Sequence, residues 1–353
     1  MKLETALYVN KTKLSNAMTI SELEHFRDLL VDREKNLNQF LSDQGSPNPE
    51  DMRRVQGLVE DIKQALGRIE NGSYGACKVC KEGVELYRLE VQPATEICLG
   101  CINEEEKNLL EEELYLASKI HRALLPQAIR KIDGFETAAR ALAARSVGGD
   151  YYDFLPAADG QATRLVIADT MGKGIPAGLL MANVQGALRI LAEETAQPSK
   201  LMSRLNQWLC RNIPVTNFVS AVCLTVESGA GSKSGLIYTN AGHCPPILLR
   251  AHGAIERLEP NGGVLGVHQE FTYSESSARL TSGDWLILYT DGVTEALNSS
   301  KELFGEDRLS EYLRSNRQLT ADNLLTGLLQ EVNRFTGKKE LDDDLTVIAL
   351  KKL

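Results

Sequence analysis

The segment Ala168-Asp169-Thr170-Met171-Gly172-Lys173-Gly174 joins an apolar, strand-like run at 164–168 to an apolar helical segment over 175–192. Its aspartate therefore lies where a strand stops and solvent begins. Three further segments repeat this arrangement beside other apolar runs: Gly148-Gly149-Asp150, Thr290-Asp291-Gly292 and Asp342-Asp343-Asp344-Leu345-Thr346. One such aspartate is usually a turn residue. Four of them predict oxygen ligands that converge on hard divalent cations, Mg²⁺ or Mn²⁺, and favour a metal-dependent hydrolase.

Short strands dominate the chain from residue 134 onward. The runs are apolar or β-branched, and many are bounded by Gly, Asn or Asp: Phe135–Leu142, Arg164–Ala168, Phe218–Glu227, Leu236–Asn240, Pro246–Arg250, Trp285–Tyr289 and Leu345–Leu350. Helices are expected near 175–192, 198–211, 305–316 and 320–336. Strands in meander order with grouped helices predict an α+β sandwich, not a parallel doubly wound sheet.

The first third of the chain is helical in pattern. Apolar residues at helical spacing over 19–70 predict two helices joined by a breaker at 45–49, and hence an antiparallel hairpin. Asn103 is an expected N-cap for a third helix, which ends at Pro126. In that helix a short heptad pattern is formed by Leu110, Leu114, Ala117, His121 and Leu124. This linker helix either packs on its own domain or serves in dimerisation or signal transmission.

Length and composition suit a soluble protein of two domains. The chain has 353 residues, 43% apolar and 25% charged, and its net charge of −9 argues against general nucleic-acid binding. Met1 to Lys13 shows no secretory signal, and no uninterrupted apolar run approaches the ~18 residues that span a bilayer. A cytoplasmic protein without a membrane segment is expected. The predicted domains are residues 1–102, a linker helix at 103–127, and residues 128–353.

Four of the seven cysteines form two CxxC pairs, Cys77 with Cys80 and Cys98 with Cys101. Two such pairs supply four thiolates, a closed tetrahedral shell for one structural Zn²⁺. A thioredoxin-like redox function is the alternative for a single pair, but it leaves the second pair unexplained. The odd total argues against a disulfide framework.

The cysteine region resembles the DksA/TraR zinc-finger family. The resemblance rests on Tyr74–Cys80 and Tyr87–Cys101, which include Arg88-Leu89-Glu90 and Pro93-Ala94-Thr95, and with the hairpin it covers about residues 20–105. Members of that family bind RNA polymerase through a coiled-coil tip with acidic residues. The tip here, Ser42 to Asp51, lacks the spaced acidic pattern, which favours a sensory or protein-docking function.

The four acidic motifs, in this order, resemble the protein phosphatase 2C superfamily of metal-dependent Ser/Thr phosphatases, and most closely its SpoIIE/RsbU branch. The resemblance covers about 128–353 and also includes Ala144–Asp153, Asn240-Ala241-Gly242-His243 and Thr290–Glu295. It implies a β-sandwich flanked by helices and a centre of two or more Mn²⁺ or Mg²⁺ ions. Asp169 would bridge two ions, the Thr170 carbonyl would bind one, Asp291 and Asp343 would complete the core, and Asp150 would bind the second ion or a third.

Other polar residues near these motifs have alternative interpretations. Arg145 either clamps the substrate phosphate or is a surface residue. His243 is expected to order its loop in preference to acting as a general acid. Asp153 is expected to be a polar residue at a strand end in preference to supporting a ligand. Asp342 and Asp344 are expected to be solvated or to hydrogen-bond neighbouring groups.

The resemblance implies a serine/threonine phosphatase whose substrate is a phosphorylated anti-sigma-factor antagonist of the STAS type. The helical segment over 175–191 would act as a switch that the zinc module, or an upstream regulator protein, sets through the linker helix. The alternative is an RNA-polymerase-binding regulator with a phosphatase as its output domain. A catalytically inactive scaffold is a third possibility, against which the intact set of aspartates argues.

Overall fold

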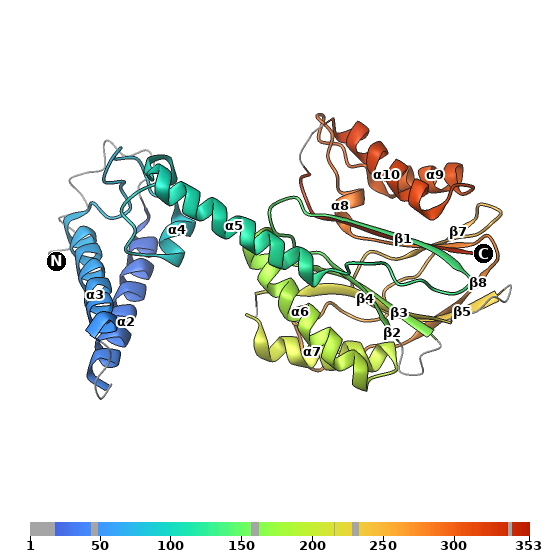
Figure 1. Ribbon diagram of the computed structural model, residues 1–353, viewed down its shortest axis with the longest axis horizontal. Helices are drawn as coiled ribbons and strands as arrows, with labels where there is room; N and C mark the ends of the chain where they lie inside the picture. Colours follow the sequence, from blue (N-terminus) through green and yellow to red (C-terminus); the bar gives the residue numbers. More distant parts are fainter. Residues whose placement is uncertain (1–17, 44–48, 157–161, 215, 228–232, 338–340) are drawn as a thin grey trace. The chain divides into compact units, whose positions relative to one another are not determined.

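The computed structural model describes residues 18–353 apart from 44–48, 157–161, 215, 228–232 and 338–340. It divides into two compact units, Met1–Glu111 and Glu112–Leu353. Figure 1 gives the elements of each unit. The division falls inside helix α5 (Glu104–Leu124), within the segment predicted as a linker.

The N-terminal unit is a helical hairpin followed by a small cysteine-containing knuckle. α2 (Ile20–Asp43) and α3 (Pro49–Asn71) lie side by side, as the apolar spacing predicts. Their buried faces meet at Phe26, Leu30 and Ile62, with Tyr74 from the following loop. Two short helices complete the unit, α4 (Leu86–Val91) and the 3₁₀ turn η1 (Leu99–Cys101). Residues 44–48 of the expected tip lie outside the described residues.

The C-terminal unit contains two five-stranded sheets in which every neighbouring pair is antiparallel. One sheet has the order β1-β10-β9-β6-β7, with bounds Phe135–Leu142, Leu345–Lys352, Trp285–Tyr289, Ile247–Leu249 and Ile255–Arg257. The other has the order β2-β3-β4-β5-β8, with bounds Tyr151–Pro156, Ala162–Thr170, Val219–Glu227, Lys233–Ala241 and Ser276–Thr281.

The two sheets are stacked and a pair of helices covers each outer face (Figure 1). Residues such as Leu165, Ile167, Leu286 and Ile348 form the core between the sheets. α6 (Ile175–Glu194) and α7 (Pro198–Asn212) cover the sheet that contains β3, and α9 (Gly305–Asn316) and α10 (Ala321–Thr336) cover the other. The predicted α+β sandwich is confirmed.

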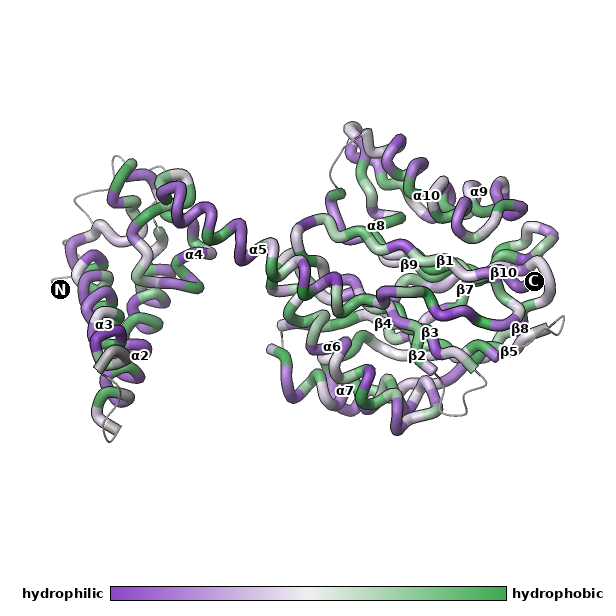
Figure 2. Tube along the Cα trace, viewed as in Figure 1, coloured by the Kyte–Doolittle hydropathy of each residue, from purple (hydrophilic) through white to green (hydrophobic). Residues whose placement is uncertain are grey.

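Helix α6 is apolar, as its sequence predicts. It is the one described helix that is long and apolar enough to cross a membrane by length and composition, and it is largely green in Figure 2. Its buried residues, among them Met181, Val184 and Leu188, pack in the same core cluster as Val166 and Ala168 of β3. This packing is that of a core helix.

Three strands, β2, β7 and β8, were not among the predicted runs. β2 begins directly after Asp150, and its residues 151–155 are buried on both faces, so it lacks the alternation of a half-exposed strand. β7 has three residues, and β8 alternates polar and apolar residues with only Leu280 fully buried. The hydrophobic signal of β7 and β8 is weak because these edge strands bury little of their surface.

Candidate functional site

The end of one sheet carries Asp150 and Asp169 beside each other. β2 pairs with β3 so that Tyr151 lies opposite Ala168, and continuing this register by one residue places Asp150 opposite Asp169. Ile167, two residues before Asp169 on the same face, belongs to the core between the sheets. Both carboxylates are therefore directed toward the end of the space between the two sheets.

The second sheet brings the other two aspartates to the same end. Asp291 follows β9 and begins the short helix α8 (Asp291–Thr294), while Asp343 comes just before β10. Because β9 and β10 are antiparallel, the end of one lies beside the start of the other. The Thr290 hydroxyl donates to Asp150 Oδ2 at 2.8 Å. This buried hydrogen bond joins the two sheets at the predicted centre.

The acids share a poorly solvated space. Burial, followed by the charges of Asp291 and Asp343, raises the pKa of Asp169 to about 7. Burial and the charge of Asp169 raise the pKa of Asp150 well above its ordinary value. Burial and the charge of Glu295 likewise raise the pKa of Asp291. A bound divalent cation would relieve this repulsion and favour the ionised carboxylates.

Two glycines let the ligand-bearing segments approach. A Cβ on Gly149 would lie 2.6 Å from Oγ1 and 2.9 Å from the carbonyl oxygen of Thr170. A Cβ on Gly292 would overlap the carbonyl oxygen of Asp344. The carbonyl of Thr170, a predicted ligand, is thus held against the residue that precedes Asp150.

Asp344 fixes the backbone of the loop that leads to the centre. It is buried, and its two carboxylate oxygens accept the backbone N–H groups of Ala144 at 2.7 Å and Gly149 at 2.6 Å. Of the two expectations for Asp344, hydrogen bonding to neighbouring groups is confirmed, and exposure to solvent is not observed. Asp344 thereby fixes the loop that carries Arg145 and leads into Asp150.

Two cations flank the aspartates. Lys173 Nζ lies 2.8 Å from Asp343 Oδ2 and donates to the carbonyl oxygen of Asp342 at 2.7 Å. Arg145 is exposed, and its side chain passes over Gly174, where a Cβ would lie 3.5 Å from Arg145 Cδ. The Arg145 side chain therefore lies beside the segment that follows Asp169, with its guanidinium accessible to a ligand.

His243 is buried and orders its loop. Its backbone N–H donates to Asn240 Oδ1 at 2.8 Å, and its Nδ1 lies 2.7 Å from Oγ of Ser220, the residue paired with Asp169. Burial lowers the pKa of His243 to about 4. A neutral imidazole at physiological pH is a poor general acid, which agrees with the expected structural function.

The expectation for Asp153 was wrong. Asp153 is buried within β2, where it accepts hydrogen bonds from the Tyr151 hydroxyl at 2.7 Å and from Arg189 Nε at 3.0 Å. Arg189 belongs to α6, so this ion pair ties the strand after Asp150 to the helix after Asp169. Nothing local in the sequence indicates this pair, because Arg189 lies 36 residues further along the chain.

His121 is the buried residue of α5. Its Nε2 lies 3.0 Å from the carbonyl oxygen of Gly148, and burial lowers its pKa. Leu124 and Leu125 pack against the core of the C-terminal unit. The last turns of α5 are therefore part of this unit and touch the loop that leads to Asp150, a contact that the heptad pattern alone did not predict.

The carboxylate set fits hard divalent cations. Its donors are all oxygens, from four aspartates and one backbone carbonyl, which is the chemistry that Mg²⁺ and Mn²⁺ prefer. Within the described residues the only cation that forms an ion pair with these predicted ligands is Lys173. Burial and, after it, the charges of Asp291 and Asp343 raise the pKa of Asp169 to about 7, and a bound divalent cation would offset this negative charge.

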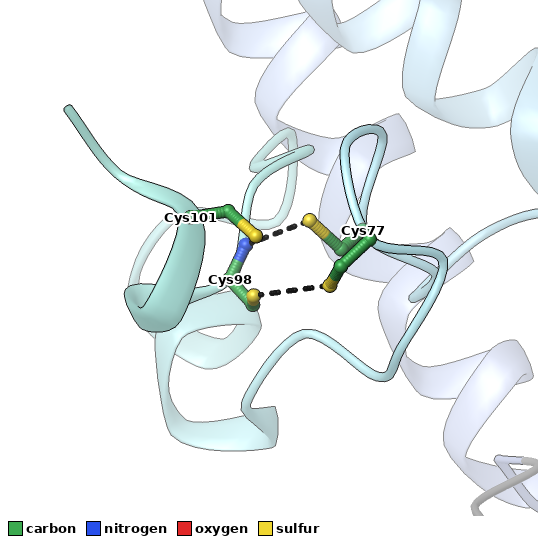
Figure 3. A group of neighbouring side chains, drawn as sticks. Cys77, Cys98 and Cys101 are labelled. Atoms are coloured by element: carbon green, nitrogen blue, oxygen red, sulfur yellow. Dashed lines mark hydrogen bonds between the residues drawn. The ribbon is translucent and has the colours of Figure 1, made fainter.

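The four predicted cysteines form a compact group in the N-terminal unit. Their Sγ atoms all lie within 4.8 Å of one another and none is in a disulfide. Figure 3 shows Cys77 facing Cys98 and Cys101 from the opposite knuckle. The Cys98 N–H donates to Cys77 Sγ at 3.4 Å, and Cys80 Sγ lies 3.6 Å from Cys98 Sγ. This spacing fits a tetrahedral S₄ site with Zn–S bonds of about 2.3 Å.

The helix-covered double sheet, with aspartates from both sheets at one end, defines a phosphatase domain of the protein phosphatase 2C type. A family model described as Stage II sporulation protein E (SpoIIE) matches residues 159–352, more than half of the chain. The chain belongs to the SpoIIE family, and its C-terminal unit is a serine/threonine phosphatase domain.

Relatives cover both units. The phosphoserine phosphatase RsbU of Bacillus subtilis (strain 168) is 28% identical over 247 residues, 69% of this chain and 71% of that protein. The RNA polymerase-binding transcription factor DksA of Salmonella typhimurium is 26% identical over 110 residues, 27% of this chain and 72% of that protein. The SiaA-PP2C domain of Pseudomonas aeruginosa has the same fold, with a TM-score of 0.62 and 18% identity over 70% of this chain and 98% of that one.

Proposed function

We propose that this protein is a Mn²⁺- or Mg²⁺-dependent phosphatase of phosphoserine or phosphothreonine in a protein substrate, with Asp150, Asp169, Asp291, Asp343 and the Thr170 carbonyl as metal ligands. The proposal is supported by the position of Asp150 and Asp169 from one sheet and of Asp291 and Asp343 from the other at the same end of the double sheet. The charges of Asp291 and Asp343 act on Asp169, and Thr290 links the two sheets at this point.

Two or more bound divalent ions would supply a water-derived hydroxide near neutral pH. Asp169, whose pKa is raised by the charges of Asp291 and Asp343 and whose own charge raises the pKa of Asp150, would help to hold the ions. Asp344 keeps the loop before Asp150 in place through two backbone N–H groups. Arg145, exposed at the edge of the site, would orient the substrate phosphate through its planar guanidinium. Placement and charge supply most of the acceleration of phosphomonoester hydrolysis.

The proposed substrate is a phosphorylated anti-sigma-factor antagonist of the STAS type. Support comes from the relative named phosphoserine phosphatase RsbU and from the motif order. Dephosphorylation would let the antagonist capture an anti-sigma kinase and release a sigma factor. A full-length Asp291→Asn variant should trap the phosphorylated antagonist, and recovery of unrelated phosphoproteins would refute this assignment.

We further propose that Cys77, Cys80, Cys98 and Cys101 bind one structural Zn²⁺, and that domains at 1–102 and 128–353 communicate through the linker helix at 103–127. The contact from His121 to Gly148 gives the end of α5 access to the loop that leads into Asp150. Movement of α6, which the Asp153–Arg189 pair ties to β2, would alter the same loop from the other side.

This regulation can be tested with a fragment that begins at Glu112 and so retains His121. If the zinc module sets the activity, the fragment and the full-length chain should differ in kcat at equal Mn²⁺ concentration. Equal rates would remove the regulatory proposal and leave the phosphatase proposal intact.

Two interactions of the N-terminal half are proposed as well. α5 exposes Leu109, Leu116 and Ile120, which supports a homodimer through the linker helix. The likeness of this half to DksA supports RNA polymerase as a second candidate partner, which co-purification with polymerase would test. Homodimerisation and polymerase binding are both consistent with the proposed cytoplasmic location.

The direct assay is hydrolysis of p-nitrophenyl phosphate with and without Mn²⁺. We expect Mn²⁺-dependent turnover that Asp169→Asn abolishes. Turnover that survives this substitution would contradict the proposed centre, and a wild type with no turnover on any phosphomonoester would indicate the inactive scaffold.

A further inference from the structure

A cavity of about 310 Å³ lies beside the aspartate centre, entirely within the C-terminal unit. Arg122 and Leu125, from the end of α5 and the residue after it, line one part of it. Leu142 and Arg145, from the end of β1 and the loop after it, line another part, and Asp150 lies at its border with the centre. The cavity therefore connects the linker helix to the predicted metal site.

The acidic groups that line this cavity already have hydrogen-bond partners, whereas its arginines have no ion-pair partner among the described residues. Asp344 uses both oxygens for backbone N–H groups, and Asp150 accepts from Thr290. Arg122 and Arg145 are exposed, and in the described part of the chain neither guanidinium has an ion-pair partner. The cavity thus offers two unpaired cations together with an apolar wall from Leu125 and Leu142.

We propose that this cavity binds the polypeptide segment next to the phosphorylated residue of the substrate. A carboxylate of that segment pairs with Arg122, and a small apolar side chain lies against Leu125 and Leu142. The inference rests on the proposed phosphatase function. A phosphoserine whose phosphate reaches Arg145 and the aspartates must place its neighbouring residues within a few ångströms, because consecutive Cα atoms are ~3.8 Å apart. The adjoining cavity is the space available to them.

The linker helix is then a part of the substrate site. Arg122 is next to His121, which bonds the loop before Asp150. A displacement of the end of α5 would change recognition of the flanking residues together with the placement of that loop. Selectivity for an acidic flank is the property that distinguishes this proposal from a purely structural linker.

The test uses full-length protein with Mn²⁺ and three phosphoserine peptides that differ only in the residues on both sides of the phosphoserine: Glu, Gln or Lys. We expect kcat/KM to fall in the order Glu, Gln, Lys, by roughly two- to fivefold per step, the range of an exposed ion pair. Arg122→Ala should remove this order, and Arg122→Glu should reverse it. Arg130→Ala, an exposed arginine outside the cavity, should keep it. Added NaCl at 0.5 M should reduce the differences in kcat/KM, because a Debye length of ~4 Å screens exposed ion pairs.

The possible results distinguish failure of the cavity proposal from failure of the phosphatase proposal. Hydrolysis of all three peptides at equal rates, or a Glu preference that survives Arg122→Glu, overturns the cavity proposal while the phosphatase proposal stands. Failure of the wild type to hydrolyse any peptide or p-nitrophenyl phosphate overturns the phosphatase proposal itself.

Discussion

The two predicted metal sites differ in how their ligands are distributed along the chain. The cysteines lie within the single segment 77–101 and pack against the helical hairpin. The aspartates lie between residues 150 and 343 and meet only when two separate sheets stack. A local thiolate site can organise its own small unit, whereas the carboxylate site depends on a complete core and is itself a source of repulsion. The two sites should therefore respond in opposite ways to substitution.

Loss of a cysteine should have the largest effect, and only on the N-terminal unit. Cys98→Ser is expected to abolish stoichiometric zinc and unfold that unit, because structural zinc contributes on the order of 10 kcal/mol. Zinc analysis and circular dichroism measure this change. Both tryptophans, Trp208 and Trp285, lie in the C-terminal unit, so their fluorescence should show an unaltered phosphatase transition. Cys210→Ser is the matched control. Retention of zinc by Cys98→Ser would contradict the four-thiolate site.

Loss of the central aspartate should remove activity and leave the fold intact. Asp169→Asn is expected to lower kcat with Mn²⁺ by about 10³-fold or more, since it removes the proposed bridging ligand. The tryptophan-monitored unfolding midpoint of the metal-free protein should rise, because one of the repelling charges is gone. Asp133→Asn, an exposed acid, serves as the control. A variant that loses activity by unfolding would refute this comparison with the cysteine site.

The repulsion among the aspartates predicts a dependence of stability on pH. Asp169 titrates at about 7 in the folded protein but near 3.9 when unfolded, so the folded state binds more protons between these values. The contribution of Asp169 to the free energy of unfolding is fully present below about pH 4. It is lost as the pH rises through 7, by on the order of 4 kcal/mol.

Urea unfolding of the metal-free protein, followed by tryptophan fluorescence at pH 5 and pH 8, measures this contribution. The wild type should lose more stability between the two values than Asp169→Asn does, and Mn²⁺ should reduce the difference. An equal loss in both proteins would show that Asp169 carries no unusual charge repulsion.

The smallest expected effect concerns the contact between the linker helix and the site. His121→Ala should destabilise the C-terminal unit by about 1–2 kcal/mol, because the Gly148 carbonyl loses its buried partner. It should also raise the Mn²⁺ concentration needed for half-maximal activity. His121→Gln, which can still donate a hydrogen bond, should recover part of both effects. If alanine and glutamine behave alike, the hydrogen bond does not position the loop.

The sequence was informative wherever periodicity and motif coincided. The helices α6, α7, α9 and α10 lie close to their predicted ranges, and strands such as Trp285–Tyr289 match because they are continuous apolar runs. The capping of α5 by Asn103, whose Oδ1 accepts the Glu106 N–H at 2.8 Å, follows from local chemistry alone. The cysteine cluster was predictable for the same reason, since spacing alone brings the four sulfurs together.

What escaped prediction depends on contacts between distant segments. Asp344 is one of three successive aspartates, and nothing local shows that it holds the backbone of Ala144 and Gly149. Asp153 was misassigned because its partner, Arg189, lies on another element. His121 occupied an apolar position of a heptad, and only the packed end of α5 reveals its bond to Gly148. Gly148 and Gly149 offered one indirect signal, since adjacent glycines beside an acid indicate close backbone approach.

The most direct measurement is X-ray diffraction from crystals of the full-length protein grown with Mn²⁺, with data collected at the manganese absorption edge. The account predicts at least two anomalous peaks about 4 Å apart, with Asp169 touching both and with Asp291 and Asp343 on one of them. No peak between the two sheets, or a lone peak that Asp169 does not touch, would contradict it.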